Sequence, residues 1–232
     1  AGWGRRPSTA KARTLATRMG LGFIALEDGF LRSFGTGEHF PPLSLVVDDQ
    51  GIYYDSTSAS ALETMLDSDT DLLAGIAADV ARARALVLRH RLSKYNHAPV
   101  LDPEDFTRRF LSPEGAGKNG GEAQRVLVID QTAGDMSVTL GGATADTFAA
   151  MLAAARVENP QATIYVKTHP EVSSGRKGGY LTHVQDDART VVLRQAVNPL
   201  SLIEQMDRVY VVTSIMGFEA LLADKPVTVF GM

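Results

Sequence analysis

The sequence predicts an α/β fold built on a parallel sheet. From residue 125 onward, short runs rich in Val and Ile alternate with longer segments of helical periodicity. This alternation is typical of parallel strands that are covered by helices on both faces of the sheet. The chain has 232 residues, of which 44% are hydrophobic, so it is long enough and apolar enough to bury a large core.

In the first part of the chain, the sequence predicts a helix, a buried strand, a hairpin and two further helices. Apolar residues at helical spacing before Gly20 predict the first helix, and the apolar run that follows predicts the strand. The hairpin is favoured because Asp and Gly at 48–51 separate two runs of β-forming residues. The predicted ranges are helix 9–19, strand 22–26, hairpin strands 43–47 and 52–54, and helices 60–66 and 72–90.

A linker is predicted at residues 112–121, where a proline and several glycines favour flexible chain over packed structure. This linker divides the chain into an N-terminal domain of residues 1–111 and a C-terminal domain of residues 122–232. Residues 1–4 read as a loop that should follow a strand, and 227–230 read as a strand with nothing after it. We therefore expect a fragment that is truncated at both ends.

In the C-terminal domain, strands and helices are predicted to alternate regularly. Ligands of such parallel sheets bind outside the carboxyl ends of the strands, so polar residues that directly follow strands are candidates for the functional site. The predicted strands are 125–130, 163–167, 190–193, 208–212 and 227–230, and the predicted helices are 146–157, 200–206 and 217–223.

The composition excludes several classes of protein. A formal net charge of -4 argues against a general nucleic-acid binder, which needs a clustered basic excess. The sequence has no cysteine, which excludes disulfide scaffolds and cysteine-based metal sites or nucleophiles. There is no apolar run near the ~20 residues that span a bilayer and no signal peptide, so a cytoplasmic location is expected. Glycine-rich dinucleotide and Walker sequences are also missing.

Polar residues follow predicted strands at four places. A His, a Lys, hydroxyl groups and backbone N–H groups at helix N-termini together favour an anion site, such as one for a nucleotide phosphate. Three of the four places lie in the regular second half of the chain. The four places are residues 27–29, 131–135, 167–170 and 213–214.

Each of these candidates also has a structural explanation, which the sequence alone leaves open. Glu27 and Asp28 fit a solvated turn or a helix cap, and Asp135 fits a helix N-cap. His169 comes before a proline and fits a hydrogen-bonded histidine in a rigid loop. The hydroxyl pair at 213–214 fits a cap for the helix that follows it.

Three further positions have two interpretations each. Glu219 lies one turn into the last predicted helix, where it fits a ribose-binding carboxylate or an exposed helical glutamate. Arg176 and Lys177 fit a site for an anionic sugar or a solvated basic loop. Trp3 fits a sugar-stacking aromatic or a buried loop anchor.

Nine runs of the sequence stand in order along nearly the whole chain: residues 3–8, 26–33, 42–49, 51–55, 92–96, 130–138, 167–172, 178–180 and 211–222. Together they resemble the KpsC family of Kdo transferases of capsule synthesis. The match looks more like the N-terminal of the two transferase modules that these proteins usually carry. The sequence departs from the family at Ile215, where a polar residue is common, and at Glu171, where Asp is common.

The resemblance implies a GT-B arrangement, in which two Rossmann-like domains face a cleft. It implies that CMP-Kdo is the donor and that a Kdo oligosaccharide on lysophosphatidylglycerol is the product. Gln131 and Asp135 match the family's catalytic motif, in which the aspartate is the catalytic residue. The matches at 167–170 and 213–214 imply a donor site, for which the candidate residues are Lys167, His169, Pro170, Thr213 and Ser214. Glu219 and Lys177 join these candidates through their own chemistry, as a ribose-binding carboxylate and a cation for an anionic sugar.

The family is retaining, which implies a covalent glycosyl-enzyme intermediate. Asp135 is then the nucleophile, while Glu27 or, second, Asp28 accepts the proton of the acceptor hydroxyl. We expect no metal ion and no cofactor besides the donor, because His169, Lys167 and the helix at Ser214 supply positive charge for the leaving phosphate.

The expected partners are CMP-Kdo, a glycolipid acceptor at the inner-membrane surface, and capsule assembly or export proteins, but no nucleic acid. Peripheral attachment to the inner membrane is an alternative to a free cytoplasmic state. Two other functions stay open. One is a transferase for another CMP- or nucleotide-activated sugar, similar to sialyltransferases, and the other is a non-catalytic module for sugar binding or assembly.

Overall fold

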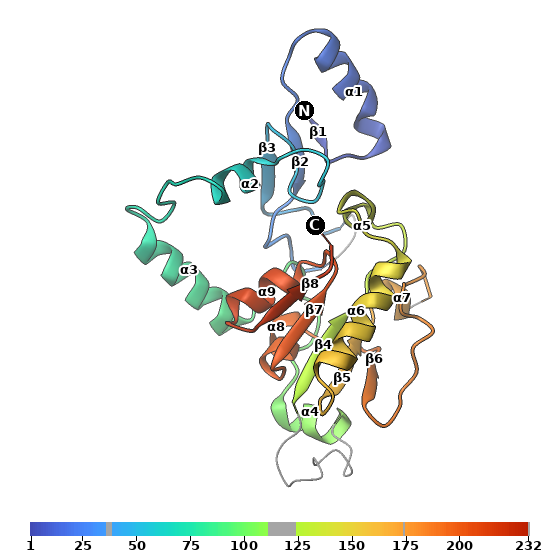
Figure 1. Cartoon of the computed structure of the whole chain (residues 1–232). Coiled ribbons are helices and arrows are strands. Elements are labelled where there is room, and N and C mark those ends of the chain that lie inside the picture. Colours follow the sequence, from blue (N-terminus) through green and yellow to red (C-terminus); the bar gives the residue numbers. More distant parts are fainter. Residues whose placement is uncertain (36–38, 111–123, 174, 232) are drawn as a thin grey trace. The chain divides into compact units, whose positions relative to one another are not determined.

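The computed structural model describes residues 1–35, 39–110, 124–173 and 175–231 (Figure 1). The chain divides into two compact units, Ala1–His97 and Ala98–Met232. The predicted linker, 112–121, lies outside the described residues, and the division between the units falls before it. The helix α4 (Pro103–Phe110) belongs to the second unit. The reason is that the ring of Phe106 is fully buried there, with its centroid 5.3 Å from that of Tyr165.

The first unit contains a small mixed sheet and three helices. Its strand order is β1-β2-β3, with β1 parallel to β2 and β2 antiparallel to β3. The elements are β1 (Gly2–Trp3), α1 (Pro7–Arg18), β2 (Ala25–Asp28), β3 (Leu45–Asp48), α2 (Ala61–Leu66) and α3 (Ala77–His90).

The predicted hairpin is wrong, because β3 pairs with β2 and not with residues 52–54. Val46 lies opposite Glu27, and Leu45 lies opposite Asp28. Residues 52–54 instead follow a tight turn, in which the Asp48 carboxylate accepts the N–H groups of Gln50 and Gly51, both at 2.8 Å. The Asx-type turn was correctly located, but it leads away from the sheet.

The starts of α2 and α3 have clear local causes. At α2, Ser60 and Glu63 form a capping box: the Ser60 hydroxyl accepts the Glu63 N–H at 3.1 Å, and the Glu63 carboxylate accepts the Ser60 N–H at 2.7 Å. The helix predicted at 72–90 begins only at Ala77. Gly75 has a φ of +78°, which an α-helix does not accommodate, so the helix starts after it.

The second unit confirms the predicted parallel sheet. Its five strands run in the order β6-β5-β4-β7-β8, and every pair is parallel. The short helices α4, α5 and α7 were not predicted. Besides α4, the elements are β4 (Arg125–Ile129), α5 (Met136–Leu140), α6 (Ala145–Glu158), β5 (Thr163–Lys167), α7 (Pro170–Ser173), β6 (Thr190–Leu193), α8 (Pro199–Glu204), β7 (Arg208–Val211), α9 (Met216–Leu222) and β8 (Val227–Val229).

Helices cover both faces of this sheet, as Figure 1 shows for α6 on one side and α8 and α9 on the other. Alternate residues of each strand point to opposite faces. Val126 and Val128 therefore join the core under α6, while Leu127 and Ile129 join the core under α4, α8 and α9. All four of these side chains are almost completely buried, with 2% or less of their surface exposed.

The strand order creates a topological switch point between β4 and β7. From β4 the chain continues to β5 on one side, whereas from β7 it continues to β8 on the other. Open α/β sheets bind their ligands outside the carboxyl ends of the strands at such a point. The residues that follow β4, β5 and β7 are thus the ones to inspect. Among the described residues, no helix is long and apolar enough to cross a membrane.

Candidate functional site

A side-chain bridge joins the two loops at the switch point. Gln131 follows β4, and Thr213 lies two residues after β7. The Gln131 amide oxygen accepts the Thr213 N–H at 3.0 Å, and the amide nitrogen donates to the Thr213 hydroxyl at 3.0 Å. Gln131 is almost fully buried, with 4% exposed. This candidate residue therefore fixes the geometry of the loops, and Thr213 is engaged by it instead of capping α9.

Asp135 belongs to the same hydrogen-bonded network and also caps a helix. It is the N-cap of α5, where its Oδ1 accepts the N–H of Ser137 at 3.0 Å and the Ser137 hydroxyl at 2.8 Å. The Ser137 hydroxyl also lies 3.1 Å from the Thr213 hydroxyl. The capping explanation is thus correct, and it involves only one oxygen. Among the described residues, Oδ2 of Asp135 has no hydrogen-bond partner.

Lys167 is a buried cation without a carboxylate partner. It ends β5 and has 6% of its surface exposed. Its Nζ donates to the Thr168 carbonyl at 2.7 Å, and no acidic group of the described residues pairs with it. Burial lowers the pKa of Lys167 from 10.5 to about 8. An ammonium group that is buried in this way is costly unless a ligand supplies negative charge.

His169 lies two residues beyond Lys167, and among the described residues only one of its ring nitrogens has a hydrogen-bond partner. Its Nδ1 accepts the N–H of Glu171 at 3.2 Å. In the neutral ring the proton is then on Nε2, which is a donor. Burial lowers the pKa of His169; the charge of Glu171 opposes this shift, and the charge of Lys167 adds to it. Pro170, another candidate, is the first residue of α7.

Lys177 has a partner within its own loop. Its Nζ lies 3.0 Å from the Glu171 carboxylate, and the side chains of both residues are exposed. The backbone N–H groups of Arg176 and Lys177 both donate to the Glu171 carbonyl. Glu171 therefore shapes this basic loop and shares the charge of Lys177.

Helix α9 contributes Glu219 and is preceded by Ser214. The expectation of an exposed helical glutamate is wrong, because Glu219 has 0% of its surface exposed. The Ser214 hydroxyl accepts the N–H of Met216 at 3.3 Å, but the N-cap residue of α9 is Ile215, which forms no side-chain capping bond, so Ser214 lies one residue before the cap position. The second unit therefore brings together the candidates that follow β4, β5 and β7.

Sequence reasoning missed Asp130, a buried carboxylate that docks a distant loop onto the end of β4. Its Oδ1 accepts three N–H groups, from Gln131 at 2.9 Å, Tyr180 at 3.0 Å and Leu181 at 3.1 Å. Burial raises the pKa of Asp130, and these N–H donors partly offset the effect. The only signal in the sequence was that the runs 130–138 and 178–180 both resemble the same family.

Gly179 is packed so closely against Asp130 that it has no room for a side chain. A Cβ at this position would lie 2.4 Å from the Oδ2 of Asp130 and 3.1 Å from Val172. The neighbouring Gly178 has ample room, since the nearest atom would be 3.9 Å away, on Ala133. The pair offers a matched test of how tightly this loop is docked.

We expect Gly179→Ala to destabilise the second unit by about 1–3 kcal/mol, as overpacking of a tight site does. Gly178→Ala should leave the free energy of unfolding unchanged or raise it slightly, because alanine restricts the unfolded chain. Denaturant unfolding of the two variants measures the difference. Equal stability of both would show that the loop is not docked as described.

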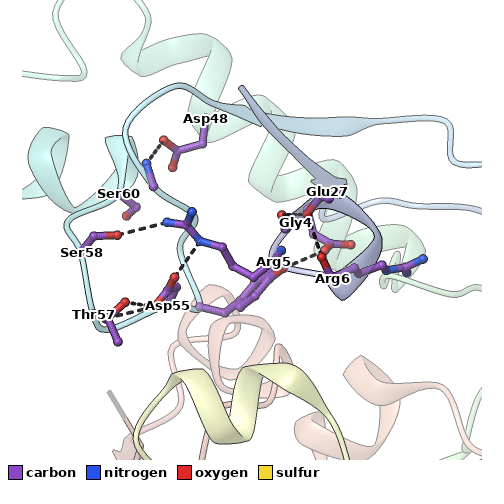
Figure 2. A network of polar contacts seen from close by, with 12 residues as sticks. Gly4, Arg5, Arg6, Glu27, Asp48, Asp55, Thr57, Ser58 and Ser60 are labelled. Carbon is purple, nitrogen blue, oxygen red and sulfur yellow. Dashed lines mark hydrogen bonds and ion pairs between the residues drawn. The ribbon is translucent and has the colours of Figure 1, made fainter. Parts of the chain in front are cut away.

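The first unit holds the other two candidates, Glu27 and Asp28, and both have partners; Figure 2 shows Glu27 with its polar contacts. Oε1 of Glu27 accepts the indole N–H of Trp3 at 3.1 Å, and Oε2 accepts the Tyr54 hydroxyl at 3.2 Å. Asp28 forms an ion pair with Arg32 at 2.8 Å. The solvated-turn explanation is therefore wrong for both carboxylates, and Trp3 is anchored to one of them.

No group of three potential metal ligands, counted over the residues that the structure describes, is arranged to hold an ion. Asp130 instead accepts backbone N–H groups, and Asp28 pairs with Arg32.

Comparisons with known proteins agree on one family. A model of the capsule polysaccharide biosynthesis protein family matches residues 1–232. The capsule polysaccharide modification protein LipA of Neisseria meningitidis serogroup A is 50% identical over 232 residues, which are 100% of this chain and 32% of LipA. The lipopolysaccharide-processing protein LpsZ of Rhizobium meliloti is 34% identical over 99% of this chain and 50% of LpsZ.

Two solved structures of KpsC from Thermosulfurimonas dismutans share the fold. The β-Kdo 2,4-transferase is 45% identical, with a TM-score of 0.84 over 100% of this chain and 68% of that one. The β-Kdo 2,7-transferase is 28% identical, with a TM-score of 0.61 over 99% of this chain and 63% of that one. The chain thus spans about a third of the length of LipA and about two thirds of each transferase structure.

Proposed function

This chain belongs to the capsule polysaccharide biosynthesis protein family, and from that premise we propose that it forms part of a retaining β-Kdo glycosyltransferase. The donor is CMP-Kdo, and the acceptor is a Kdo-bearing phosphatidylglycerol or lysophosphatidylglycerol glycolipid. The similarity to two Kdo transferases supports the reaction class. We assign the two units to the Rossmann-like halves of a GT-B enzyme, working at the cytoplasmic face of the inner membrane beside the capsule assembly and export proteins.

The observation that carries the proposal is the buried Lys167 at the carboxyl end of β5. Its ammonium group has one carbonyl partner and no carboxylate among the described residues. An anionic ligand would offset the cost of its burial, and the phosphate of CMP is such a ligand. Because β5 is adjacent to β4 in the sheet, this cation lies one strand away from the switch point.

The other donor-site candidates complete this assignment. The free Nε2–H of His169 donates to the same phosphate, and the Ser214 hydroxyl provides a second donor. Glu219 accepts hydrogen bonds from the ribose hydroxyls. Lys177 and Pro170 shape the loop that follows β5, and Lys177 neutralises the carboxylate of the sugar.

The proposed reaction uses two carboxylates in succession. The Oδ2 of Asp135 attacks the anomeric carbon of Kdo, and the bond from that carbon to the phosphate oxygen breaks, releasing CMP. Lys167 and His169 stabilise the negative charge on the leaving phosphate, so the step needs no metal and no cofactor beyond the donor. The acceptor hydroxyl then attacks the same carbon, Asp135 leaves, and Glu27, with Asp28 as the alternative, accepts the proton.

The test is incubation of the protein with CMP-Kdo and a Kdo-primed glycolipid, followed by mass analysis of the products. A lipid product heavier by one Kdo supports the proposal. Transfer from CMP-sialic acid alone would replace it with a transferase for another CMP-sugar. Binding of the glycolipid without turnover of any donor would indicate a non-catalytic module.

We expect His169→Ala to weaken CMP binding by about tenfold or more, because a hydrogen bond to a charged group contributes about 1.5–3 kcal/mol. Titration calorimetry with CMP measures the loss. His90→Ala, at the exposed last turn of α3, is the control and should bind CMP normally. Unchanged affinity of a folded His169 variant would remove this residue from the donor site.

A further inference from the structure

The hydroxyl of Tyr54 sits between a carboxylate and the backbone of another loop. It donates to the Oε2 of Glu27 at 3.2 Å and accepts the N–H of Arg5 at 3.2 Å. The other oxygen of Glu27, Oε1, accepts the indole N–H of Trp3 at 3.1 Å and the backbone N–H of Asp28 at 3.0 Å. Both oxygens of this carboxylate are therefore held by donors, which come from three segments of the first unit.

The contact between Tyr54 and the backbone requires a glycine. Gly4 has a φ of +50°, and a Cβ at this position would lie 2.1 Å from the Tyr54 hydroxyl oxygen and 3.0 Å from the Oε2 of Glu27. Figure 2 shows Gly4 directly beside Glu27. The absence of a side chain at residue 4 is what lets the Arg5 N–H reach Tyr54.

The side chain of Arg5 fastens the loop that carries Tyr54. Its Nε lies 2.7 Å from the Oδ2 of Asp55, and its terminal nitrogen donates to the Ser58 hydroxyl at 3.2 Å (Figure 2). Asp55 is 5% exposed, and its other oxygen accepts the N–H and hydroxyl of Thr57. Arg5 thus contacts the loop twice with its side chain and once with its backbone.

The ionisation of the surrounding groups keeps this arrangement constant near neutral pH. Burial raises the pKa of Tyr54, and the negative charge of Glu27 adds to that effect, so the hydroxyl stays protonated and remains a donor. The other charged groups nearby are Arg6, the pair of Arg5 with Asp55, and the pair of Asp28 with Arg32. Because its pKa is raised, the Tyr54 hydroxyl can therefore donate to Glu27 near neutral pH.

We propose that Tyr54 and Arg5 are positioning residues: Tyr54 orients the Glu27 carboxylate directly, and Arg5 acts through Tyr54. The proposal rests on the proposed function in one respect, that Glu27 receives the proton of the acceptor. Orientation of a general base contributes to the rate because its carboxylate oxygen must lie within hydrogen-bonding distance of the acceptor hydroxyl and be correctly aligned with it. Neither residue touches the reacting atoms, so neither contributes to donor affinity.

The test compares Tyr54→Phe with the matched control Tyr53→Phe. Loss of the Tyr54 hydroxyl should lower kcat for transfer by about tenfold to a hundredfold and leave the KM for CMP-Kdo unchanged. Removing the hydroxyl of the adjacent Tyr53 should change neither. Equal kcat values for the wild type and Tyr54→Phe would overturn the proposal.

A second readout is independent of turnover. Trp3 is the single tryptophan of the chain and donates to Glu27, so its fluorescence reports on the surroundings of the Glu27 carboxylate. Tyr54→Phe should shift the Trp3 emission to longer wavelength, because a freed carboxylate admits water to the indole. If the wild type shows no Kdo transfer while Tyr54→Phe shifts the emission, the proposed function fails and the contact between Tyr54 and Glu27 stands. If the wild type transfers Kdo and the emission does not shift, the proposed function stands and the positioning role of Tyr54 fails.

The role of Arg5 is tested with a double-mutant cycle. If Arg5 acts through Tyr54, then Arg5→Ala combined with Tyr54→Phe should lower kcat no further than Tyr54→Phe alone. Multiplication of the two single effects would show that Arg5 acts elsewhere. Should Arg5→Ala fail to fold, Arg5→Lys keeps the positive charge beside Asp55, loses the second contact to Ser58, and completes the same cycle.

Discussion

Asp135→Asn is expected to lower Kdo transfer by about three orders of magnitude or more while the protein remains folded. Removal of a covalent nucleophile has effects of this size. Folding should be preserved because asparagine is as good an N-cap as aspartate, so the bonds from Ser137 to Oδ1 can still form. The substitution thus replaces Oδ2, the oxygen proposed to attack the sugar, with an amide nitrogen, and it keeps Oδ1, which caps α5.

Two further measurements separate catalysis from capping. Ser137→Ala removes the 2.8 Å hydroxyl bond to Asp135 and should alter stability more than rate. In the wild type, a poor acceptor should slow the second step, so that a mass increment of one Kdo accumulates on the peptide that contains Asp135. An increment mapped to Glu27 instead would exchange the roles of the two carboxylates, and a near-normal rate for Asp135→Asn would exclude a nucleophilic role.

The two units differ in how far the sequence could predict them. In the second unit, the central strands β4 and β5 are short Val- and Ile-rich runs that are buried on both faces, so local composition identifies them. In the first unit, β3 pairs with β2 across an intervening segment of 16 residues, from Gly29 to Ser44. A nearby turn at Asp48 therefore suggested a local hairpin that tertiary pairing overrides.

The candidate site shows a similar limit. Residues at the ends of strands, such as Lys167, or shortly after them, such as Gln131, could be found because the carboxyl ends of parallel strands meet at one edge of the sheet. The docking of the Gly179 loop on Asp130 could not be predicted, because it joins residues about 50 positions apart. It also depends on backbone N–H groups, which every residue except proline has, so no residue type indicates it. The burial of Glu219 was missed for a related reason: helical periodicity does not reveal that a charged residue is buried.

Lys167→Met is expected to abolish measurable CMP binding and, at the same time, to stabilise the protein. The lowering of the Lys167 pKa from 10.5 to about 8 means that folding disfavours the charged form by about 3 kcal/mol. Below pH 8 the residue is charged in both the folded and unfolded states, so the whole cost is present. Between about pH 8 and 10.5 the folded protein loses the proton first, and the cost is progressively relieved.

Methionine has a similar length and no charge, so the variant should gain up to about 3 kcal/mol of unfolding free energy at pH 7 relative to the wild type, and less at pH 10. Urea unfolding at the two pH values measures this gain, and calorimetry with CMP measures the loss of binding. In the wild type, CMP affinity should fall as pH rises through 8, because the ammonium charge that holds the phosphate is lost.

Lys225→Met is the matched control, since Lys225 also donates to a backbone carbonyl, that of Glu204, but in an exposed position. It should change neither the CMP affinity nor the pH dependence of stability. A residue kept only for the fold should lower stability when it is removed, whereas a buried cation kept for a ligand should raise it. If Lys167→Met bound CMP normally, or destabilised the protein at pH 7, then the charge at the end of β5 would serve the fold and the donor phosphate would have to be bound elsewhere.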